Sequence, residues 1–479
     1  MLPEALSQLA SELLDEMPWS VVLPAGCGKT ELIAAMASLN PSDAKPILVL
    51  THTNAGVDVI RKRFDKYGVI PRQARVLTLD TWAKHFNDHF PLLGEKSGVT
   101  NNPEDWQVVR KRADSVLASR HIGDIIAATY SKVLVDEYQD CSPTQHVMIE
   151  RMSNYLPVGV LGDPLQGIFD FGEGVVAWAD VEASFPAKTV PITPHRWSVK
   201  NPELGEWLLS IRPNLVAGGV IDLSNVGSFM QWRRSTADLS AEIGQCFQSH
   251  RDSIETEFVV TLLPQANQGH HLARRLAGTY NVAEEIQCKV LEPLMRGLDE
   301  SNGAIVASET IKLVKACYTG CPSALDARLI QDYARGNPRA YRSNNSFAEI
   351  YDSLNNLILD PTPIKTKAAF KLIESRCGQL FRREAWFTAM AVFRDLELSN
   401  SGSAISALRE IRNRGRFGNR YISRRSVSRT LLVKGQEYDR CIIVAAHNMS
   451  ARNLYVALSR GIENVIIFSE QPQITILDY

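Results

Sequence analysis

A short glycine-containing loop between an apolar run and a helix-like pattern limits most strongly what this chain can fold into. In VVLPAGCGKTELIAAMA, residues 21–37, the apolar start predicts a buried strand and the pattern from Lys29 onward predicts a helix. The N–H groups of such a loop and of the helix N-terminus bind a polyphosphate. Leu23 replaces the first glycine of the strict phosphate-loop pattern. A glycine turn before a core helix is therefore the alternative interpretation of this stretch alone.

Two side chains of this loop have predicted roles in binding a nucleotide with its metal. Lys29 reaches the outer phosphates and Thr30 ligates magnesium. The sequence thus predicts ATP and Mg²⁺ as ligands. The loop residues assigned to nucleotide binding are Gly26, Cys27, Gly28, Lys29, Thr30 and Glu31.

A second apolar run, KVLVDEYQD at residues 132–140, predicts a strand that ends in adjacent carboxylates. Asp136 is placed to hold magnesium through water, and Glu137 is placed to orient or deprotonate an attacking water. Two acids at a strand end are common by chance, but they are informative this far downstream of a phosphate loop. Together the two stretches indicate ATP hydrolysis.

A third stretch, PVGVLGDPLQGIFDF at residues 157–171, predicts another strand followed by a polar turn. Gln166 lies just beyond the strand, where it is suited to sense a terminal phosphate. Phe169 and Phe171 alternate, so in an extended segment both rings point to one face, where bases could stack. Two core aromatic residues are the alternative interpretation.

These stretches, in this order, resemble the UvrD/Rep branch of superfamily one DNA helicases. The resemblance covers roughly residues 1–285 and 425–479, and only weakly the region between them. Five further motifs carry it: ILVLTHTNAGVDVIRKRF (47–64), VLTLDTWAKHF (76–86), ITPHRWS (192–198), VKGQEYDRCIIV (433–444) and LYVALSRG (454–461).

The resemblance implies further site residues. It places Arg196 and Arg460 on the γ-phosphate, where two arginines neutralise charge that develops in the transition state. It implies single-stranded DNA contacts at Thr53, Asn54, Thr81, Phe169 and Phe171. For the nucleotide it implies Gly435, with Glu437 on the ribose, Gln8 as the adenine-reading glutamine, and His195 in place of the tyrosine that stacks on adenine.

The sequence departs from the family pattern at several points. In the family, a His-Ser pair precedes the Lys-Gly of its fifth motif, which corresponds to residues 433–444 here. Leu431-Leu432 replace that pair, where a DNA contact would be expected. Gly172 stands where the family has an arginine after its second stacking aromatic residue.

The implied fold class is α/β, with two RecA-like P-loop domains that have parallel sheets and each carry an inserted, mostly helical subdomain. The first domain is predicted at residues 1–198, with a short insertion at about 82–128 in which residues 104–119 predict a helix. The second domain is predicted at 199–282 and 425–479, and its helical insertion at 283–424.

An arginine-rich stretch at residues 409–429, with Phe417 and Tyr421 interleaved, lies at the end of the second insertion. Such a segment suits phosphate contacts and aromatic stacking on nucleic acid. A solvated loop that leads into the next strand is an alternative of nearly equal weight.

Composition excludes several classes of protein. A net charge of −1 means that any nucleic-acid surface is local. No uncharged apolar run reaches the length of a membrane span and the first residues are acidic, so we expect a cytoplasmic protein without membrane contact. The eight cysteines contain no CxxC pair, and free thiols are expected in preference to metal ligands.

The leading functional hypothesis is a DNA-dependent ATPase that translocates 3′ to 5′ on single strands and unwinds duplex, with polarity implied by the resemblance alone. Its partners would be single-stranded DNA and junctions of single and double strands. A second hypothesis is an ATPase that regulates an associated nuclease in antiviral defence or repair, as in the helicase subunit of the Gabija antiviral system, which also resembles UvrD and is similarly compact. A generic P-loop transporter ATPase or kinase has no place for the Arg460 motif.

Overall fold

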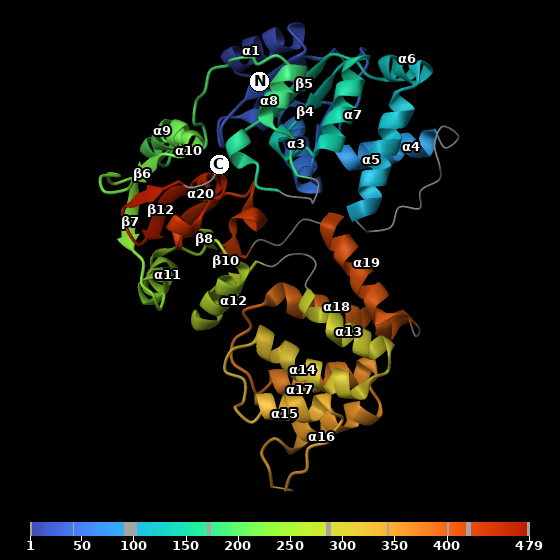
Figure 1. Cartoon of the computed structure of the whole chain (residues 1–479), viewed down its shortest axis with the longest axis vertical. Coiled ribbons are helices and arrows are strands. Elements are labelled where there is room, and N and C mark those ends of the chain that lie inside the picture. Colours follow the sequence, from blue (N-terminus) through green and yellow to red (C-terminus); the bar gives the residue numbers. More distant parts are fainter. Residues whose placement is uncertain are drawn as a thin grey trace. The chain divides into compact units, whose positions relative to one another are not determined.

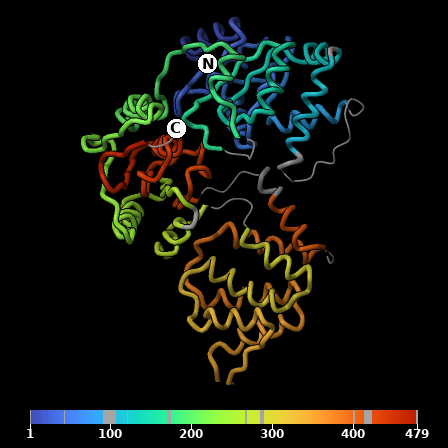
Figure 2. Tube along the Cα trace, viewed as in Figure 1, coloured from blue at the N-terminus to red at the C-terminus, as the bar shows by residue number. Residues whose placement is uncertain are grey.

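The computed structural model describes residues 2–41, 43–90, 103–169, 174–283, 289–342, 344–399, 402–417 and 423–476. These residues form two compact units. Figures 1 and 2 show their elements, coloured along the chain. The first unit draws on Met1–Met230 and Met449–Glu463, together with residues 473–476. The second unit draws on Gln231–Asn448 and Asn464–Pro472.

A five-stranded sheet forms the centre of the first unit. Its strand order is β1-β5-β4-β2-β3, and all neighbouring strands are parallel. All five strands therefore end at the same edge of the sheet. The strands are β1 (Trp19–Val22), β2 (Ile47–Thr51), β3 (Ala74–Thr78), β4 (Val133–Val135) and β5 (Val158–Gly162).

Helices cover both faces of this sheet, which explains why its strands are apolar at nearly every position. Leu48 and Leu50 of β2 belong to one core, and Ile47 and Val49 belong to the other, because successive side chains point to opposite faces. The helices of the first core are α4 (Leu79–His89), α5 (Pro103–Leu117), α6 (Arg120–Thr129), α7 (Pro143–Ser153) and α8 (Trp178–Ser184). Those of the second core are α1 (Glu4–Asp15), α2 (Lys29–Leu39) and α3 (Asn54–Tyr67).

Short elements complete the first unit, and α4 to α6 form an inserted helical segment between β3 and β4. Helix α5 confirms the helix that the sequence predicts at residues 104–119. The short elements are the 3₁₀ turns η1 (Tyr138–Asp140) and η2 (Pro164–Gln166), the helices α9 (Pro202–Ser210), α10 (Arg212–Ala217) and α20 (Ala451–Leu458), and the antiparallel pair β6 (Val220–Asp222) and β13 (Gln473–Thr475).

A six-stranded sheet forms part of the second unit. Its order is β7-β12-β11-β8-β10-β9, and β8 is parallel to both β10 and β11. Helices α11 (Ser240–Asp252) and α12 (Ala266–Arg275) pack on it. The strands are β7 (Met230–Arg234), β8 (Val259–Leu263), β9 (Asn281–Val282), β10 (Arg425–Arg429), β11 (Tyr438–Ile443) and β12 (Gly461–Ser469), with turns η4 (Thr430–Val433) and η5 (Ala446–Asn448).

A helical bundle with its own apolar core is inserted between β9 and β10 (Figure 1). Its elements are η3 (Lys289–Leu291), α13 (Glu292–Asp299), α14 (Gly303–Cys317), α15 (Ala327–Ala334), α16 (Ala348–Leu359), α17 (Pro363–Glu374), α18 (Arg383–Ser399) and α19 (Ala404–Phe417). The predicted α/β class, with two parallel sheets and helical insertions, is thus confirmed. The domain limits given above stay a prediction.

One pair of cysteines corrects the expectation of free thiols. Cys321 and Cys377 form a disulfide across 56 residues of sequence. Backbone hydrogen bonds between Thr319 and the segment Gly378–Gln379 hold the two loops together, which brings the Cα atoms of the cysteines within 4.1 Å. No local spacing announces such a contact. The cysteines of the described residues that lie outside this disulfide are Cys27, Cys141, Cys246, Cys317 and Cys441.

Two features are absent from the residues that the structure describes. No helix there is both long and apolar enough to cross a membrane. No group of three or more His, Cys, Asp or Glu side chains there could hold a metal ion. The cytoplasmic location stays a prediction.

Candidate active site

The loop between β1 and α2 has the backbone that phosphate binding requires. Gly26 and Gly28 have φ values of 70° and 90°, which glycine adopts without strain, and Gly28 is the N-cap of α2. The first N–H groups of α2 have no partner within the helix and point out of its end. Lys29 is buried, and its Nζ donates to the carbonyl of Leu23 at 2.9 Å. The loop therefore fits the polyphosphate of a nucleotide.

The predicted motif at residues 192–198 packs directly against this loop. The Arg196 N–H donates to the Gly26 carbonyl at 3.1 Å. A methyl group added to Gly26 would lie 2.7 Å from both Arg196 Cβ and Trp197 Cζ3, and one added to Gly28 would lie 3.5 Å from His195 Cδ2. The structure thus brings His195 and Arg196 beside the phosphate loop.

The paired carboxylates follow β4, close to Lys29. Asp136 is buried, and its Oδ1 accepts from the Glu137 N–H at 2.9 Å. Burial first, and then the charge of Glu137, raises the pKa of Asp136 to about 7, while the charge of Lys29 lowers it. Glu137 has a φ of 54°, a strained backbone of the kind that clusters at active sites.

A divalent cation fits these groups. A hydroxyl at Thr30 and a carboxylate at Asp136 are oxygen donors, which Mg²⁺ prefers, and a buried acid that resists ionisation gains from a cation. Bound Mg²⁺ would neutralise charge on the phosphates. Both residues therefore keep their predicted roles as a proposal.

Gln139 is a residue that the sequence analysis missed. Its Nε2 donates to the Glu137 carboxylate, and its Oε1 accepts from the Asp163 N–H at 2.9 Å. Gln166 is buried, and its Nε2 donates to Asp163 Oδ2 at 2.8 Å. Gln139 thus orients Glu137 and ties it to the turn that carries Gln166. The position of Gln139, two residues after Glu137, is the sequence feature that could have identified it.

Arg460 and Arg196 meet at the turn after α20. Arg460 is 1% exposed, and its Nε donates to the Val456 carbonyl at 2.9 Å. Its Nη2 donates to Ser459 Oγ at 2.7 Å, and Arg196 Nη1 donates to the Ser459 carbonyl at 2.8 Å. The structure therefore brings the two predicted arginines to one residue of the same unit.

Arg212, which no motif pointed to, lies beside the same loop. It donates to both carboxylate oxygens of Asp163, at 3.0 and 2.7 Å. Burial raises the pKa of Cys27 to about 11, while the nearby cations Lys29, Arg212 and Arg196 act in the opposite direction. The surroundings of the loop thus include Lys29 and Arg196, which favour an anionic ligand, while the charge of Arg212 is balanced by Asp163.

Several residues predicted to contact the nucleotide have partners of their own or belong to the second unit. Gln8 is exposed, and its Nε2 donates to Glu12 of the same helix at 2.9 Å. Glu31 accepts from the Tyr67 hydroxyl at 2.6 Å and pairs with Arg63 at 3.0 Å, so its carboxylate is bound to α3. Gly435 and Glu437 are exposed residues of the second unit, between η4 and β11.

The predicted DNA contacts of β2 and β3 are neighbours at the carboxyl edge of the first sheet. Thr51 and Thr78 are paired in register at the ends of these strands. Thr53 caps α3, which begins at Asn54, by accepting from the Gly56 N–H at 3.0 Å. Thr81 lies in the first turn of α4, whose cap is Thr78. Two adjacent helix N-termini face this edge, and helix N-termini bind phosphates.

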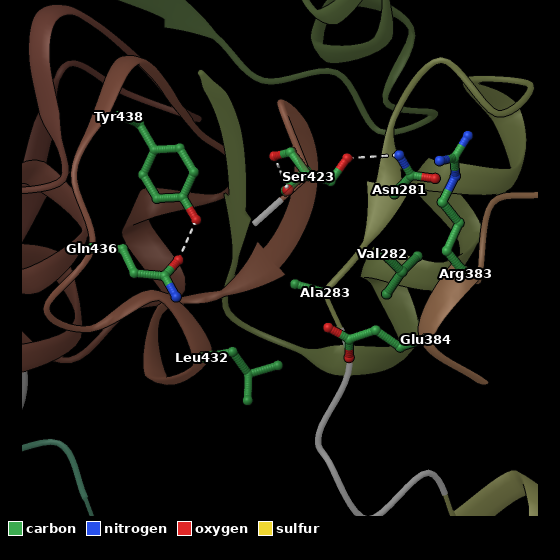
Figure 3. Close-up of a pocket in the computed structure, with 10 residues that line it drawn as sticks. Asn281, Val282, Ala283, Arg383, Glu384, Ser423, Leu432, Gln436 and Tyr438 are labelled. Atoms are coloured by element: carbon green, nitrogen blue, oxygen red, sulfur yellow. Dashed lines mark hydrogen bonds between the residues drawn. The ribbon is translucent and has the colours of Figure 1, made fainter. Parts of the chain in front are cut away.

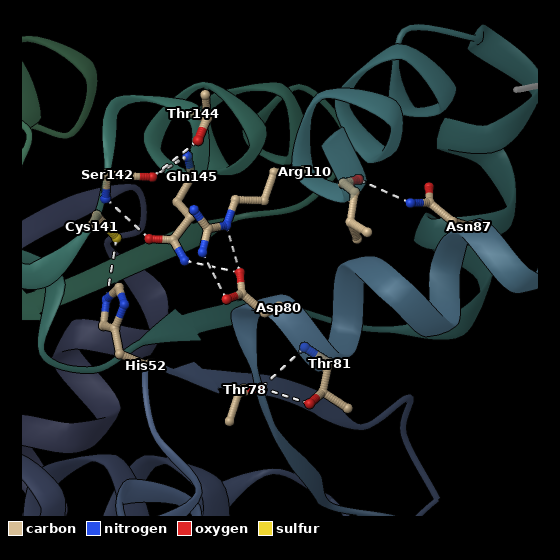
Figure 4. Close-up of polar contacts among 11 residues, drawn as sticks. His52, Thr78, Asp80, Thr81, Asn87, Arg110, Cys141, Ser142, Thr144 and Gln145 are labelled. Carbon is tan, nitrogen blue, oxygen red and sulfur yellow. Dashed lines mark hydrogen bonds and ion pairs between the residues drawn. The ribbon is translucent and has the colours of Figure 1, made fainter. Parts of the chain in front are cut away.

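A polar network supports these two turns (Figure 4). Arg110 of α5 donates to both oxygens of Asp80, at 2.7 and 2.8 Å, and Gln145 Nε2 donates to Asp80 at 3.1 Å. His52 Nε2 lies 3.5 Å from the sulfur of Cys141, which follows the turn of the paired carboxylates. Helix α5 thus holds its neighbour α4 in place through a partly buried ion pair.

The remaining predicted DNA contacts are described only in part. Phe169 follows η2 and is half-buried. Phe171 and Gly172 lie outside the described residues. So do the side chains of Phe417 and Tyr421 in the arginine-rich stretch.

A separate pocket opens in the second unit (Figure 3). It lies where the helical bundle joins the sheet, with Arg383 and Glu384 of α18 facing the β9 and β10 segments. Gln436 and Tyr438 of the fifth motif line it, and their side chains are joined by a 2.6 Å hydrogen bond. Leu432 also lines it, so part of the apolar pair that replaces His-Ser faces this pocket.

One family of known proteins matches the part of the chain that carries the paired carboxylates. Residues 95–178 match the family UvrD/REP helicase N-terminal domain, which confirms the resemblance to UvrD/Rep-like superfamily one helicases. The matched segment contains Asp136, Glu137 and Gln166. The crystal structure of Pif1 helicase from Candida albicans aligns with 98% of this chain and 95% of its own, at 11% identity and a TM-score of 0.41. The comparison with curated proteins gave no match.

Proposed function

We propose that this chain, a UvrD/Rep-like superfamily one helicase by its motifs and its matched N-terminal domain, hydrolyses ATP to move 3′ to 5′ along single-stranded DNA and to unwind duplex. In this proposal Lys29, Thr30 and Asp136 hold Mg²⁺ and ATP, and Glu137 activates the attacking water. Arg196 and Arg460 neutralise the charge that spreads over the phosphoryl oxygens in the transition state.

The observation that carries the proposal is the order of groups along one sheet edge. β1, β5 and β4 end in the phosphate loop, the Asp163 turn and the carboxylates, while β2 and β3 end in the two threonine turns. β2 joins the two halves, because Leu50 pairs with Val135 and accepts the Asp136 N–H at 2.8 Å. A DNA strand bound at the ends of β2 and β3 would therefore act on the carboxylates of Asp136 and Glu137 through the backbone of β2.

Strand displacement on tailed duplexes tests the motor directly. The wild-type protein is expected to displace the partner strand of a duplex with a 3′ tail, to need ATP and Mg²⁺, and to be inactive on a duplex with a 5′ tail. Lys29→Ala, which removes the phosphate contact, is the matched inactive control. Equal displacement by Lys29→Ala, or none from any tail, would refute an ATP-driven motor.

One observation favours a second candidate, an ATPase that regulates an associated nuclease in defence or repair. Leu431 and Leu432 lie half-buried in η4, where aliphatic side chains offer DNA no hydrogen bond. DNA contact there is then weaker than in UvrD itself, as a switch would require. Tight co-purification with a nuclease whose activity depends on ATP turnover by this chain would favour this candidate over a free motor.

A further inference from the structure

A buried chain of polar groups links the phosphate loop to two helices of the first unit that follow it far along the sequence. It runs from Ala25 of the loop to Tyr455 of α20, then to Arg212 at the start of α10, and ends at Asp163 after β5. We call these four residues the Tyr455 network.

The Tyr455 hydroxyl is the junction of this network. It accepts from the Ala25 N–H at 3.2 Å and from Arg212 Nη1 at 2.7 Å. Tyr455 is 1% exposed and Ala25 is 3% exposed, so water does not replace these contacts freely. A phenol oxygen with two acceptor positions can satisfy both donors at once. The loop therefore owes one of its buried N–H partners to α20.

Arg212 fixes that hydroxyl from the other side. The guanidinium of Arg212 forms an ion pair with the fully buried carboxylate of Asp163. It lies 5.0 Å from the centre of the Tyr455 ring. Burial opposes the charge of Arg212, but the Asp163 carboxylate outweighs this and raises the pKa of Arg212 above its ordinary value. A planar fork can serve a carboxylate and a hydroxyl together, which the single ammonium group of lysine does less well.

We propose that Tyr455 and Arg212 are positioning residues for nucleotide binding, which hold the phosphate loop in its binding shape through the Ala25 N–H. This inference rests on the proposed function, since it concerns the same nucleotide site. Neither side chain needs to touch the nucleotide. Without the hydroxyl, a buried N–H of the loop loses its partner, and the loop rearranges at the expense of phosphate binding.

The test compares Tyr455→Phe and Arg212→Lys with the matched control Tyr280→Phe. Tyr280 is also fully buried, and its hydroxyl donates to the Cys246 carbonyl at 2.9 Å in the second unit. For each purified full-length protein we would measure Kd for a fluorescent ATP analogue with Mg²⁺, kcat and KM for ATP, and Tm.

Tyr455→Phe is expected to raise Kd and KM about tenfold, with kcat nearly unchanged, because the Ala25 N–H of the loop loses its buried hydrogen bond to the hydroxyl. Arg212→Lys is expected to act in the same direction. The double variant is expected to be no worse than the more impaired single variant, because both act through one hydroxyl. Tyr280→Phe is expected to lower Tm while leaving Kd at the wild-type value.

Three results would overturn the inference. One is a wild-type Kd for Tyr455→Phe, whatever its Tm. Another is an equal rise in Kd for Tyr280→Phe, which would mean that any buried hydroxyl has this effect. The third is a wild-type protein that binds no ATP analogue. This last result would also refute the proposed function, whereas the first two would refute only the role of Tyr455, so the two failures are distinguishable.

Discussion

The close approach of Arg196 and Trp197 to the phosphate loop can be tested with a pair of glycines. Gly26 and Gly68 have nearly the same backbone conformation, with φ values of 70° and 69°. A methyl group at Gly68 would meet nothing within 4 Å, whereas one at Gly26 would lie 2.7 Å from Arg196 and Trp197. Gly26→Ala and Gly68→Ala therefore both place alanine in the left-handed region, at a similar cost in free energy. They differ in whether the added methyl group meets neighbouring atoms.

The expected magnitudes follow from that difference. Alanine in the left-handed region costs about 1 kcal/mol, and this is the whole expected cost at Gly68. Forcing an extra methyl group into a packed site costs a further ~1–3 kcal/mol, because Trp197 is buried and its Nε1 is held by the Gly461 carbonyl at 2.8 Å. We expect Gly26→Ala to destabilise the chain by about 2–4 kcal/mol.

The assay is urea unfolding of both variants beside the wild type, with nucleotide affinity measured on the folded proteins. Gly26→Ala is expected to have the lower urea midpoint and to bind the ATP analogue more weakly, because the displaced Arg196 segment lies beside the loop. Equal losses of stability in the two variants would refute the close packing of this segment on the loop.

Three other expectations concern separate parts of the molecule. Phe169→Ala should weaken binding of single-stranded DNA about tenfold in fluorescence anisotropy, from the loss of base stacking; the exposed Phe387→Ala is the control, and an equal loss there would contradict the assignment. Reductant should lower the stability of the helical bundle by about 2–4 kcal/mol through the disulfide between Cys321 and Cys377, but should not affect a Cys321→Ser/Cys377→Ser variant; alkylation of both thiols in the untreated protein would disprove this. Because the pKa of Asp136 is raised from 3.8 to about 7, mainly by burial, the folded chain holds a proton in this range that the unfolded chain has lost. In metal-free buffer the free energy of unfolding should therefore fall as pH rises through this range, and Asp136→Asn should remove that dependence of the urea midpoint on pH. Parallel curves of urea midpoint against pH for the wild type and Asp136→Asn would contradict this prediction.

Local patterns predicted much of the fold and of the site. The apolar runs at the start of residues 21–37 and of residues 157–171 predicted strands, and the structure has β1 and β5 there, because strands covered on both faces need apolar side chains at nearly every position. The phosphate loop and the Asp136-Glu137 pair were found from residue types and spacing, because each is contiguous in the chain. Their backbone features, such as the left-handed Glu137, are consistent with the roles proposed for them.

Contacts between distant segments could not be predicted in this way. Arg212 belongs to no motif and matters only because the fold places it against Asp163. Tyr455 lies within a recognised motif, but nothing local shows that its hydroxyl meets Ala25, 430 positions away in the sequence. Glu31 has the correct spacing for the loop, yet three partners on α3 bind its carboxylate.

The central claim is that one sheet edge couples DNA binding to ATP hydrolysis. ATP turnover by the purified protein with no nucleic acid, single-stranded DNA, duplex DNA or RNA, beside Glu137→Gln, tests it most directly. We expect strong stimulation by single-stranded DNA and its loss in Glu137→Gln, which keeps the shape of the side chain but removes the base. Turnover that is indifferent to every nucleic acid, or that persists in Glu137→Gln, would contradict the claim.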